Sequence, residues 1–511
     1  MTIKQLCDHL KITPPRDGAV IVPRAQLRQF SAACVHHGRP LVFMFATDER
    51  QLNKSYAVHA VFSAQDGFLT LRSVLPENDP IYPSLTQSIM AANWFERLIG
   101  DQFGIVAEGH PDWRRLMHHE NISEGVYPLR KDFAWDTKLL HADVPYPMHR
   151  VEGKGVYEIP VGPVHAGIIE PGHFRFNVRG ERILTLEGKL FFTHKGVEKL
   201  VEGKTPQEAL PFIERISGDM AVGHTLAFVQ AVEQIVGVTV PERGLYLRIV
   251  WNELERITAH LFDIGNMGGM GTGFTFMAAQ GFRMVEEMRR LHERVSGHRF
   301  LRGAIMLGGA RNIDEQGMQN LLDTLERIEK EIRNVLDIAY GSDGLMERFE
   351  TTGVLSRDAA IAYGARGIAA RASGVDTDFR RDYPYAGYGR MPFKVAVKTA
   401  GDVRARFSVR VLELYESMAL IRACLEKMPA GKTAMSFDSK EGSALGWSES
   451  FRGAVIDWVR IDAKGRIDRC AVSDPSFMNW PIFGELGPGN IVPDFPLCNK
   501  SLNLSYSGTD L

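Results

Sequence analysis

The stretch ERISGDM at residues 214–220, together with DPSFMN at residues 474–479, decides how this chain is interpreted. Neither stretch contains a cysteine. The five cysteines lie elsewhere, widely scattered and without a C-x-x-C pair among them, at positions 7, 34, 424, 470 and 498. This spacing is typical of unpaired thiols in a reducing cytosol, and it excludes a ferredoxin-type iron–sulfur site held by this chain alone.

The composition is that of an ordinary soluble globular protein. The chain has 511 residues, of which 44% are hydrophobic and 24% charged, and its net charge is −2. Its length predicts two to four domains. The net charge and the lack of a basic run give no indication of binding to nucleic acid or to anionic lipid. No secretory signal opens the sequence, and no apolar stretch approaches the ~20 residues that a membrane span needs. Any membrane or cluster is therefore expected to belong to a partner.

The pattern along the chain indicates an α+β protein with two domains, at residues 1–140 and 155–511. Short β-rich runs at 40–45 and 56–62, with a Gln65-Asp66-Gly67 turn signal, predict strands and hairpins first. A proline-rich extended linker lies at 143–147. A few strands are expected over 155–193, and the last residues, 491–511, predict integrated structure or a partner-binding tail. Apolar spacing of three and four residues predicts long helices at about 206–236, 242–265, 274–299, 314–340 and 402–427.

The two opening stretches resemble the metal-binding boxes of nickel–iron hydrogenase large subunits. In that family the boxes are E-R-x-C-G-x-C and D-P-C-x-x-C, and four cysteines hold the metals. Here Ser217 and Met220 stand in the first box, and Ser476 and Asn479 in the second. Soft thiolates are the ligands that such a centre requires. The resemblance therefore implies the hydrogenase scaffold without its nickel–iron centre and with no other metal bound by this chain.

The N-terminal part resembles the 30-kDa subunit of respiratory NADH:quinone oxidoreductase, complex I. The resemblance rests on ERLIGDQFGI at 96–105, GHPDWRRL at 109–116 and PLRKDF at 128–133, with Leu98 and Gln102 as departures. No nucleophile or metal constellation accompanies these residues. They build either a turn with its own ion pairs or a rigid polar surface, and the domain at 1–140 is assigned a docking role.

The second domain is similar to the complex I 49-kDa subunit and to the hydrogenase large subunit. Its motifs are GPVHAG at 162–167, THKGVEKL at 193–200, NELERITAHL at 252–261, GDVRAR at 401–406 and Arg452-Gly453. Together with the first domain, this resembles the fused subunit of group 4 membrane-bound hydrogenases of the formate hydrogenlyase type. The resemblance implies a small α/β domain followed by a mainly helical domain with a small β-sheet.

Three positions of the complex I quinone site can be located through this resemblance. The quinone-binding His corresponds to His165, the Tyr to Gly218, and the Asp that supports the His to Met270. The His is kept, and the other two are lost. Asp219, next to the missing Tyr, is a candidate for replacing the carboxylate. A histidine that only holds its loop remains the alternative for His165.

Further candidates come from the two boxes. Arg215 is expected either as a charge facing the cavity or as one member of an ion pair with Glu214 or Asp474. His224 keeps a histidine of the family, and helical spacing places it two to three turns inside the bundle, where a satisfied core histidine is the more common role. The candidate catalytic residues are thus His165, Arg215 and Asp219, and the candidate acceptor-binding residues are His165, Gly218, His224 and Asp474.

Two functions remain open at this stage. The first is a redox subunit, at the cytoplasmic face of the inner membrane, that passes electrons from a partner's 4Fe-4S cluster to quinone or another acceptor. The second is a non-catalytic scaffold or coupling subunit. Either form would assemble with a small iron–sulfur subunit and with membrane subunits. The glycine-rich run at 268–273 follows a helix rather than a strand, so NAD, if used, is expected on another subunit.

The missing thiolates yield a first prediction. Because serine, methionine and asparagine replace all four cysteines, the purified chain should contain no stoichiometric nickel, and its complex should not evolve hydrogen. Elemental analysis of the purified complex is the measurement. A content of about one nickel per chain would contradict the interpretation of both boxes.

Overall fold

The N-terminal part is a four-stranded sheet with helices packed on it. The computed structural model describes residues 1–13, 18–165 and 169–511. The strands β1 (Ala19–Ile21), β2 (Leu41–Asp48), β3 (Ser55–Ala64) and β4 (Gly67–Pro76) lie in the order β1-β4-β3-β2. The hairpin of β3 and β4 closes at the predicted turn, where Ala64 pairs with Gly67. The helices of this part are α1 (Ile3–Leu10), α2 (Leu27–His36) and α4 (Asn93–Phe103).

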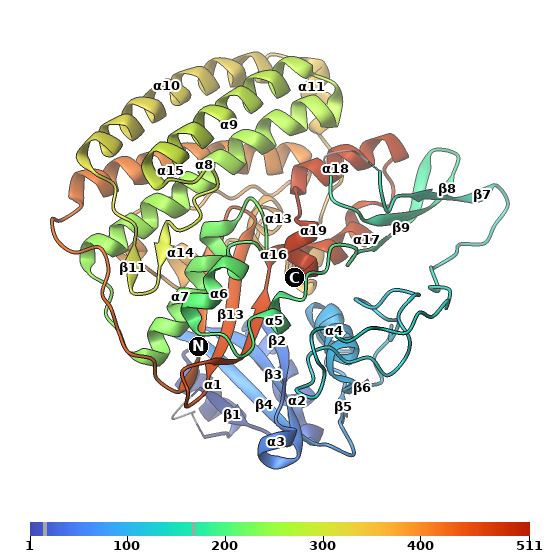
Figure 1. Cartoon of the computed structure of the whole chain (residues 1–511). Helices are drawn as coiled ribbons and strands as arrows, with labels where there is room; N and C mark the ends of the chain where they lie inside the picture. Colours follow the sequence, from blue (N-terminus) through green and yellow to red (C-terminus); the bar gives the residue numbers. More distant parts are fainter. Residues whose placement is uncertain (14–17, 166–168) are drawn as a thin grey trace.

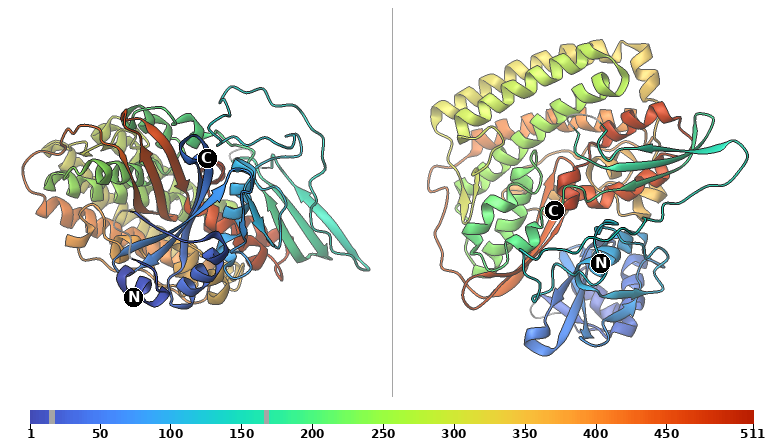
Figure 2. Two further views of the ribbon diagram at one scale, coloured as in Figure 1. Left: turned by 90° about the horizontal axis from the view of Figure 1, so that it is seen from below. Right: turned by 45° about the vertical axis from the view of Figure 1, so that its right-hand side comes forward.

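Both faces of this sheet are covered. Every residue of β2 and β3 is buried, although a sheet with one face in water would alternate between buried and exposed positions. Helix α4 contacts β2, and the C-terminal strands of the chain cover the sheet from another side (Figure 2). After β6 (Val106–Glu108) the chain runs to residue 155 without a helix or strand.

A three-stranded meander opens the second part. Its strands β7 (Val156–Val161), β8 (His173–Arg179) and β9 (Arg182–Lys189) are antiparallel and project to the side of the molecule (Figure 1). Phe174 on β8 lies against Trp480 and Phe495, with ring centroids 5.9 and 4.8 Å apart. The meander is therefore anchored to the C-terminal segment of the chain.

Long helices form the largest layer (Figure 1). They are α7 (Ala221–Val236), α8 (Glu242–Thr272), α9 (Thr275–Ser296), α10 (Glu315–Tyr340) and α15 (Val403–Lys427). Helix α8 packs along both α9 and α15. It also continues past the predicted end at residue 265, because Gly265 and Gly281 let the backbones of α8 and α9 touch: a Cβ on Gly281 would lie 2.7 Å from the Cα of Gly265. The run 268–273 thus ends a helix rather than forming a dinucleotide loop.

The predicted continuous helix over 206–236 is wrong. The structure contains α6 (Pro206–Ile213) and α7 (Ala221–Val236), and residues 214–220 between them form turns. His224 therefore lies in the first turn of α7 rather than two to three turns into a helix.

Another three-stranded sheet, near the C-terminus, was not predicted from the sequence. Its strands β12 (Gly442–Ser450), β13 (Gly453–Ile461) and β14 (Ile467–Ser473) are antiparallel in that order. Helix α7 covers one face, and the N-terminal sheet approaches the other, where Trp458 lies 4.8 Å from Phe45 between ring centroids. The N-terminal strands and the C-terminal sheet belong to one hydrophobic cluster.

The C-terminal residues are integrated into the fold. They form α16 (Pro475–Asn479), α17 (Phe483–Leu486), α18 (Phe495–Leu502) and α19 (Tyr506–Asp510). The carboxylate of Asp510 accepts hydrogen bonds from the N–H groups of Phe191 and Thr193 at 2.9 and 2.8 Å. The sequence predicted either integrated structure or a partner-binding tail for residues 491–511, and the structure shows that they are packed into the fold. No helix in the part of the chain that the structure describes is long and apolar enough to cross a membrane.

The contact between the two sheets gives a second prediction. Trp458→Ala should lower the free energy of unfolding by ~3–5 kcal/mol, because it empties a buried site between the sheets. Trp135→Ala is the matched control: that side chain is 74% exposed, and its loss should change stability by less than ~0.5 kcal/mol. Urea unfolding and limited proteolysis near residue 140 are the measurements. Equal effects of the two substitutions would show that the sheets are not energetically coupled.

Candidate functional site

The two boxes meet at Ser505. The first box lies in the turns before α7, and the second begins α16 directly after β14. The hydroxyl oxygens of Ser505 and Ser217 are 3.0 Å apart, and the Ser505 N–H donates to the hydroxyl of Ser476 at 3.0 Å. Ser505, the residue that precedes α19, therefore connects the two boxes, which are far apart in the sequence.

At the four positions of the missing cysteines, the side chains find their hydrogen-bond partners or their packing contacts within the protein. Ser217 also donates to Asp219 at 2.9 Å. The side-chain amide of Asn479 accepts from the N–H of Arg366 at 2.9 Å and donates to the carbonyl of the same residue at 3.2 Å. Met220 is fully buried in an apolar cluster with Phe451.

This set of side chains does not fit a nickel–iron centre. The hydroxyls and the amide are hard donors already engaged within the protein, and a thioether is a poor substitute for a bridging thiolate. Within the described ranges, moreover, no three His, Cys, Asp or Glu side chains form a group suited to a metal ion.

Asp474 and His224 form a buried pair beside the boxes. Nε2 of His224 lies 3.0 Å from Oδ2 of Asp474, and both side chains are inaccessible to solvent. The other oxygen of Asp474 accepts from the Ser476 N–H at 2.6 Å and caps α16. His224 thus has the bonded core position that was considered for it, while its Nδ1 has no partner among the described residues.

The contacts of Arg215 and Asp219 differ from what the sequence predicts. Arg215 is exposed and donates to the carbonyl of Pro211 in α6 at 2.6 Å. Neither Glu214 nor Asp474 is hydrogen-bonded to it among the described residues. Asp219 receives two hydrogen bonds from Arg452, both 2.8 Å long. Arg452 is 3% exposed in its side chain and Asp219 is 44% exposed, so the pair lies at the edge of the core.

The charge of Arg452 determines the ionisation of Asp219. Partial burial alone would raise the pKa of Asp219, but the attraction and hydrogen bonds of Arg452 outweigh it, so the pKa is lowered. Arg452 lies in the turn between β12 and β13. In the sequence, Arg452 was recognised only as part of a family motif. Its contact with Asp219 shows its role at the site.

His165 lies near the boxes through the last helix. Its ring centroid is 6.2 Å from that of Tyr506 on α19 and 6.0 Å from that of Phe174. Its Nδ1 lies 3.0 Å from the carbonyl oxygen of Pro163, and its Nε2 is buried without a partner among the described residues. The rest of its motif, 166–168, lies outside the described residues.

Tyr506, Gly218 and Met270 complete this region. Burial raises the pKa of Tyr506 to about 12, so its hydroxyl keeps its proton at neutral pH. Sequence reasoning did not single out Tyr506. At Gly218 a Cβ would meet no atom within 4 Å, so the position is open, and Met270 is 56% exposed. The structure therefore brings His165, Asp474 and the boxes together around α19, but places Arg215 outside this group.

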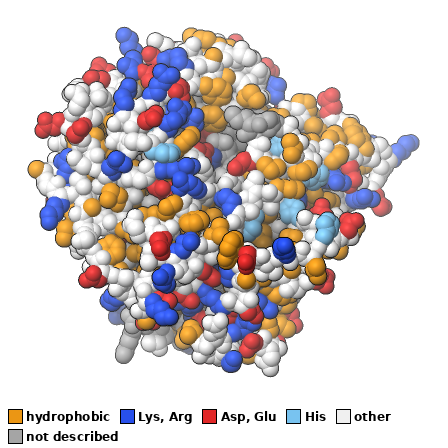
Figure 3. All heavy atoms as spheres, viewed as in Figure 1, with side chains coloured by type: hydrophobic (Ala, Val, Ile, Leu, Met, Phe, Trp, Pro, Cys, Tyr) orange, Lys and Arg blue, Asp and Glu red, His pale blue; other side chains and the backbone are white. Residues whose placement is uncertain are grey.

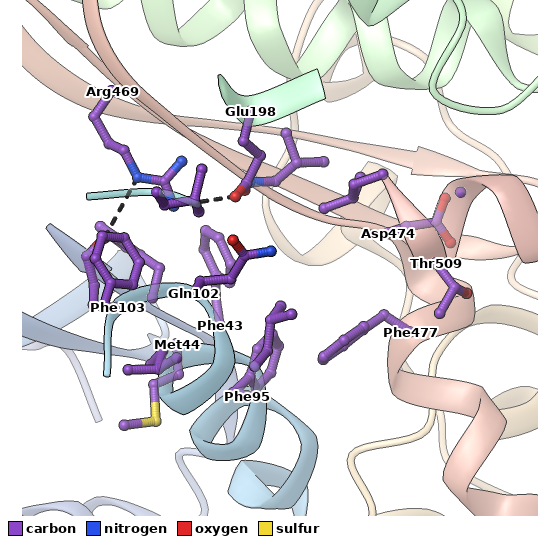
Figure 4. A pocket seen from close by; sticks show the side chains of 18 residues that line it. Phe43, Met44, Phe95, Gln102, Phe103, Glu198, Arg469, Asp474, Phe477 and Thr509 are labelled. Carbon is purple, nitrogen blue, oxygen red and sulfur yellow. Dashed lines mark hydrogen bonds and ion pairs between the residues drawn. The ribbon is translucent and has the colours of Figure 1, made fainter. Parts of the chain in front are cut away.

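A narrow cavity reaches Asp474 from the N-terminal part (Figure 4). Phe43, Phe95 and Phe103 line it on one side, and Asp474 and Thr509 lie at its other end. Its volume is about 30 Å³, which is enough for one or two water molecules. A quinone ring does not fit into it.

The two arginines near the first box give a third prediction. Arg452→Ala should lower the free energy of unfolding by ~1.5–3 kcal/mol, because it removes charge-assisted hydrogen bonds to Asp219. Arg215→Ala removes an exposed side chain and should change it by less than ~0.5 kcal/mol. Chemical unfolding of the two variants is the measurement. The reverse order would mean that Arg215, not Arg452, carries the structural charge here.

Comparison with known families agrees with the motifs. The family model of the respiratory-chain NADH dehydrogenase 49 Kd subunit matches residues 269–441, and that of the 30 Kd subunit matches residues 20–138. The model of the nickel-dependent hydrogenases matches residues 195–264.

Several relatives match most of the chain, across both its N-terminal part and its second part. Formate hydrogenlyase subunit 5 of Escherichia coli K12 is 32% identical over 92% of this chain and 84% of its own length. Hydrogenase-4 component G of the same organism is 32% identical over 93% of this chain and 84% of its own length. An NADH-quinone oxidoreductase subunit of Clostridium beijerinckii is 31% identical over 65% of this chain and 91% of its own length. The resemblance stated from the motifs is confirmed: the chain belongs to the family of fused 30-kDa/49-kDa-type subunits that includes formate hydrogenlyase subunit 5 and hydrogenase-4 component G.

Proposed function

We propose that the chain is the large subunit of a membrane-associated, respiratory-type oxidoreductase complex and works without a nickel–iron centre. Its relatives are, by name, subunits of formate hydrogenlyase, of hydrogenase-4 and of NADH-quinone oxidoreductase. The partners are a small iron–sulfur subunit, which receives electrons from NAD or another donor bound elsewhere in the complex, and membrane subunits. The chain itself is placed peripherally, at the cytoplasmic face of the membrane.

The bridge of Ser217, Ser505 and Ser476 supports the absence of the metal centre. Hydroxyl and amide hydrogen bonds hold the two boxes together where a hydrogenase uses coordination bonds. Because each of these groups already has a partner, a metal would have to break the bonds before it could bind.

The observation that carries an acceptor site is the unpaired Nε2 of His165. A buried polar atom without a partner costs ~1–3 kcal/mol, which a bound ligand can offset. When Nδ1–H donates to Pro163, the neutral ring has a lone pair on Nε2 that accepts a hydrogen bond from the hydroxyl of a hydroquinone. The protonated ring instead donates from Nε2 to a quinone carbonyl. His165 can therefore hold either form of the acceptor while two electrons and two protons are added.

Two neighbouring features suit the same acceptor. The open position at Gly218 leaves space where complex I has a tyrosine, and the hydroxyl of Tyr506 lies on the helix beside His165. Tyr506 donates no side-chain hydrogen bond among the described residues, since in its contact with Asn499 the amide is the donor.

A scaffold role is the second candidate, and a specific observation favours it. Asp474 is bonded to His224, and Asp219 to Arg452, so the polar groups nearest the boxes face one another rather than a ligand. The cavity that reaches Asp474 also has room only for water.

Replacement of His165 distinguishes the two functions, as a fourth prediction. His165→Ala should reduce quinone reduction by the purified complex by roughly 100-fold, because the proton-donating hydrogen-bond partner of the acceptor is lost. His173→Ala is the matched control: its Nδ1 lies 3.2 Å from the carbonyl of Gly162, so it contacts the same loop, and its Nε2 lies 3.5 Å from Arg175. Steady-state turnover and the yield of assembled complex are measured together. If His165→Ala leaves both unchanged, the acceptor site is not at this residue and the scaffold role is favoured.

A further inference from the structure

A second pocket lies on the other side of Asp219, between α8 and α9. Thr258 and Phe262 of α8, Arg289 and His292 of α9, and Phe300 after α9 line it. Its volume is about 90 Å³. We propose that this pocket, called here the α8–α9 pocket, binds a small monocarboxylate anion through Arg289. The proposal goes beyond the redox function and does not depend on it.

Arg289 is the group that requires a ligand. Its guanidinium has no hydrogen-bond or ion-pair partner among the described residues, and it lies over the ring of Phe300, 5.1 Å from the centroid. Burial, and next the charge of Arg299, lower its pKa from the usual value, while the charges of Asp219 and Glu286 act in the opposite direction. A guanidinium remains charged at any physiological pH. A half-buried cation that makes no hydrogen bond or ion pair is stabilised by an anion that enters the pocket.

The acidic side chains in the wall make no hydrogen bond or ion pair with Arg289, because their oxygens are bonded to other groups. Both oxygens of Asp219 are held by Arg452. Those of Glu255 accept the N–H groups of Val222 and Gly223, at 2.7 and 3.0 Å. Burial raises the pKa of Glu255 to about 8, although these two hydrogen bonds act in the opposite direction.

The remaining polar groups leave the pocket positive. His292 is engaged at both nitrogens, by Thr258 and by the carbonyl of Arg299, each at 3.2 Å. Burial lowers its pKa to about 4, so it is neutral at pH 7. Arg299 is paired with Glu286 at 2.7 Å. Among the charged side chains that line the pocket, within the described part of the chain, Arg289 is therefore the one that makes no hydrogen bond or ion pair.

Basic residues continue outside the pocket. Arg302 follows the lining residue Leu301, and the charges of Arg302 and Arg215 add to burial in lowering the pKa of His298. The three side chains are therefore close enough to interact. Figure 3 shows basic side chains gathered over the helical half of the face that it presents. The exposed Arg215 thus belongs to a basic rim rather than to the boxes.

Size and lining select the class of anion. A guanidinium binds a planar carboxylate through two parallel hydrogen bonds. Phe262, Ala259 and Leu301 supply apolar wall, which suits a short hydrocarbon tail. A phosphate dianion would be poorly matched by one unpaired arginine. Acetate and propionate have the volume and the single charge that the pocket accepts.

Calorimetric titration of the purified complex tests this inference, as a fifth prediction. Sodium acetate and sodium propionate are titrated at constant ionic strength, with sodium chloride as the reference. The wild-type complex should show saturable binding of both carboxylates. Arg289→Ala should weaken it by roughly tenfold or more, because a hydrogen bond to a charged group contributes ~1.5–3 kcal/mol and each 1.4 kcal/mol is tenfold.

Two further variants separate binding from folding. Arg294→Ala removes an exposed arginine of the same helix and should leave affinity within about twofold of wild type. Arg289→Lys keeps the charge and the length of the side chain but loses the paired hydrogen bonds, so the complex should assemble normally and bind more weakly. Absence of saturable binding in the wild type, or equal affinity in wild type and Arg289→Lys, would overturn the proposal. Neither result would bear on quinone reduction at His165.

Discussion

The buried carboxylate of Asp474 is the contact on which the arrangement of the boxes depends. One oxygen caps α16, and the other is bonded to His224 at the start of α7. Helix α19 packs against the same oxygen so closely that a Cβ on Gly508 would lie 2.3 Å from it. Three elements from distant parts of the sequence therefore meet at one acidic side chain. Since a buried carboxylate is stable only when its oxygens are bonded, α7 and α16 must assemble together, and α19 packs onto the pair that they form.

The sequence was most informative where the signal is local. The helix expected over 314–340 is α10 (Glu315–Tyr340), because its apolar residues repeat with the helical period along one face. The Gln65-Asp66-Gly67 turn was equally clear. The sheet of β12, β13 and β14 was missed because β13 is buried on both faces, and a strand of that kind shows no alternation. The burial comes from an N-terminal sheet some four hundred residues earlier in the chain, which no local pattern reports.

The candidate site was predictable in its members but not in their pairing. Motifs identified Asp219, Asp474 and His224, yet the partner of Asp219 is Arg452, from the turn between β12 and β13. Arg215, its neighbour in sequence, points outward because residues 214–220 form turns and not the expected helix. Spacing along a chain gives side-chain directions only inside regular elements. In irregular stretches the direction is set by tertiary contacts, here by Ser505 and Arg452, and these had to be observed.

Ser217, Met220, Ser476 and Asn479 in place of the four family cysteines change what can stabilise this region. A metal bound by several thiolates can contribute ~10 kcal/mol or more to folding, whereas a hydroxyl hydrogen bond contributes ~0.5–1.5 kcal/mol net. The bonds at Ser505 cannot by themselves replace a metal centre. Stability near the boxes must come instead from the ion pair of Asp219 with Arg452, the bonded pair of Asp474 with His224, and the aromatic packing of Trp480 on Tyr506. None of these contacts involves a group that changes its oxidation state. The surface around the boxes is therefore organised by contacts within the protein itself.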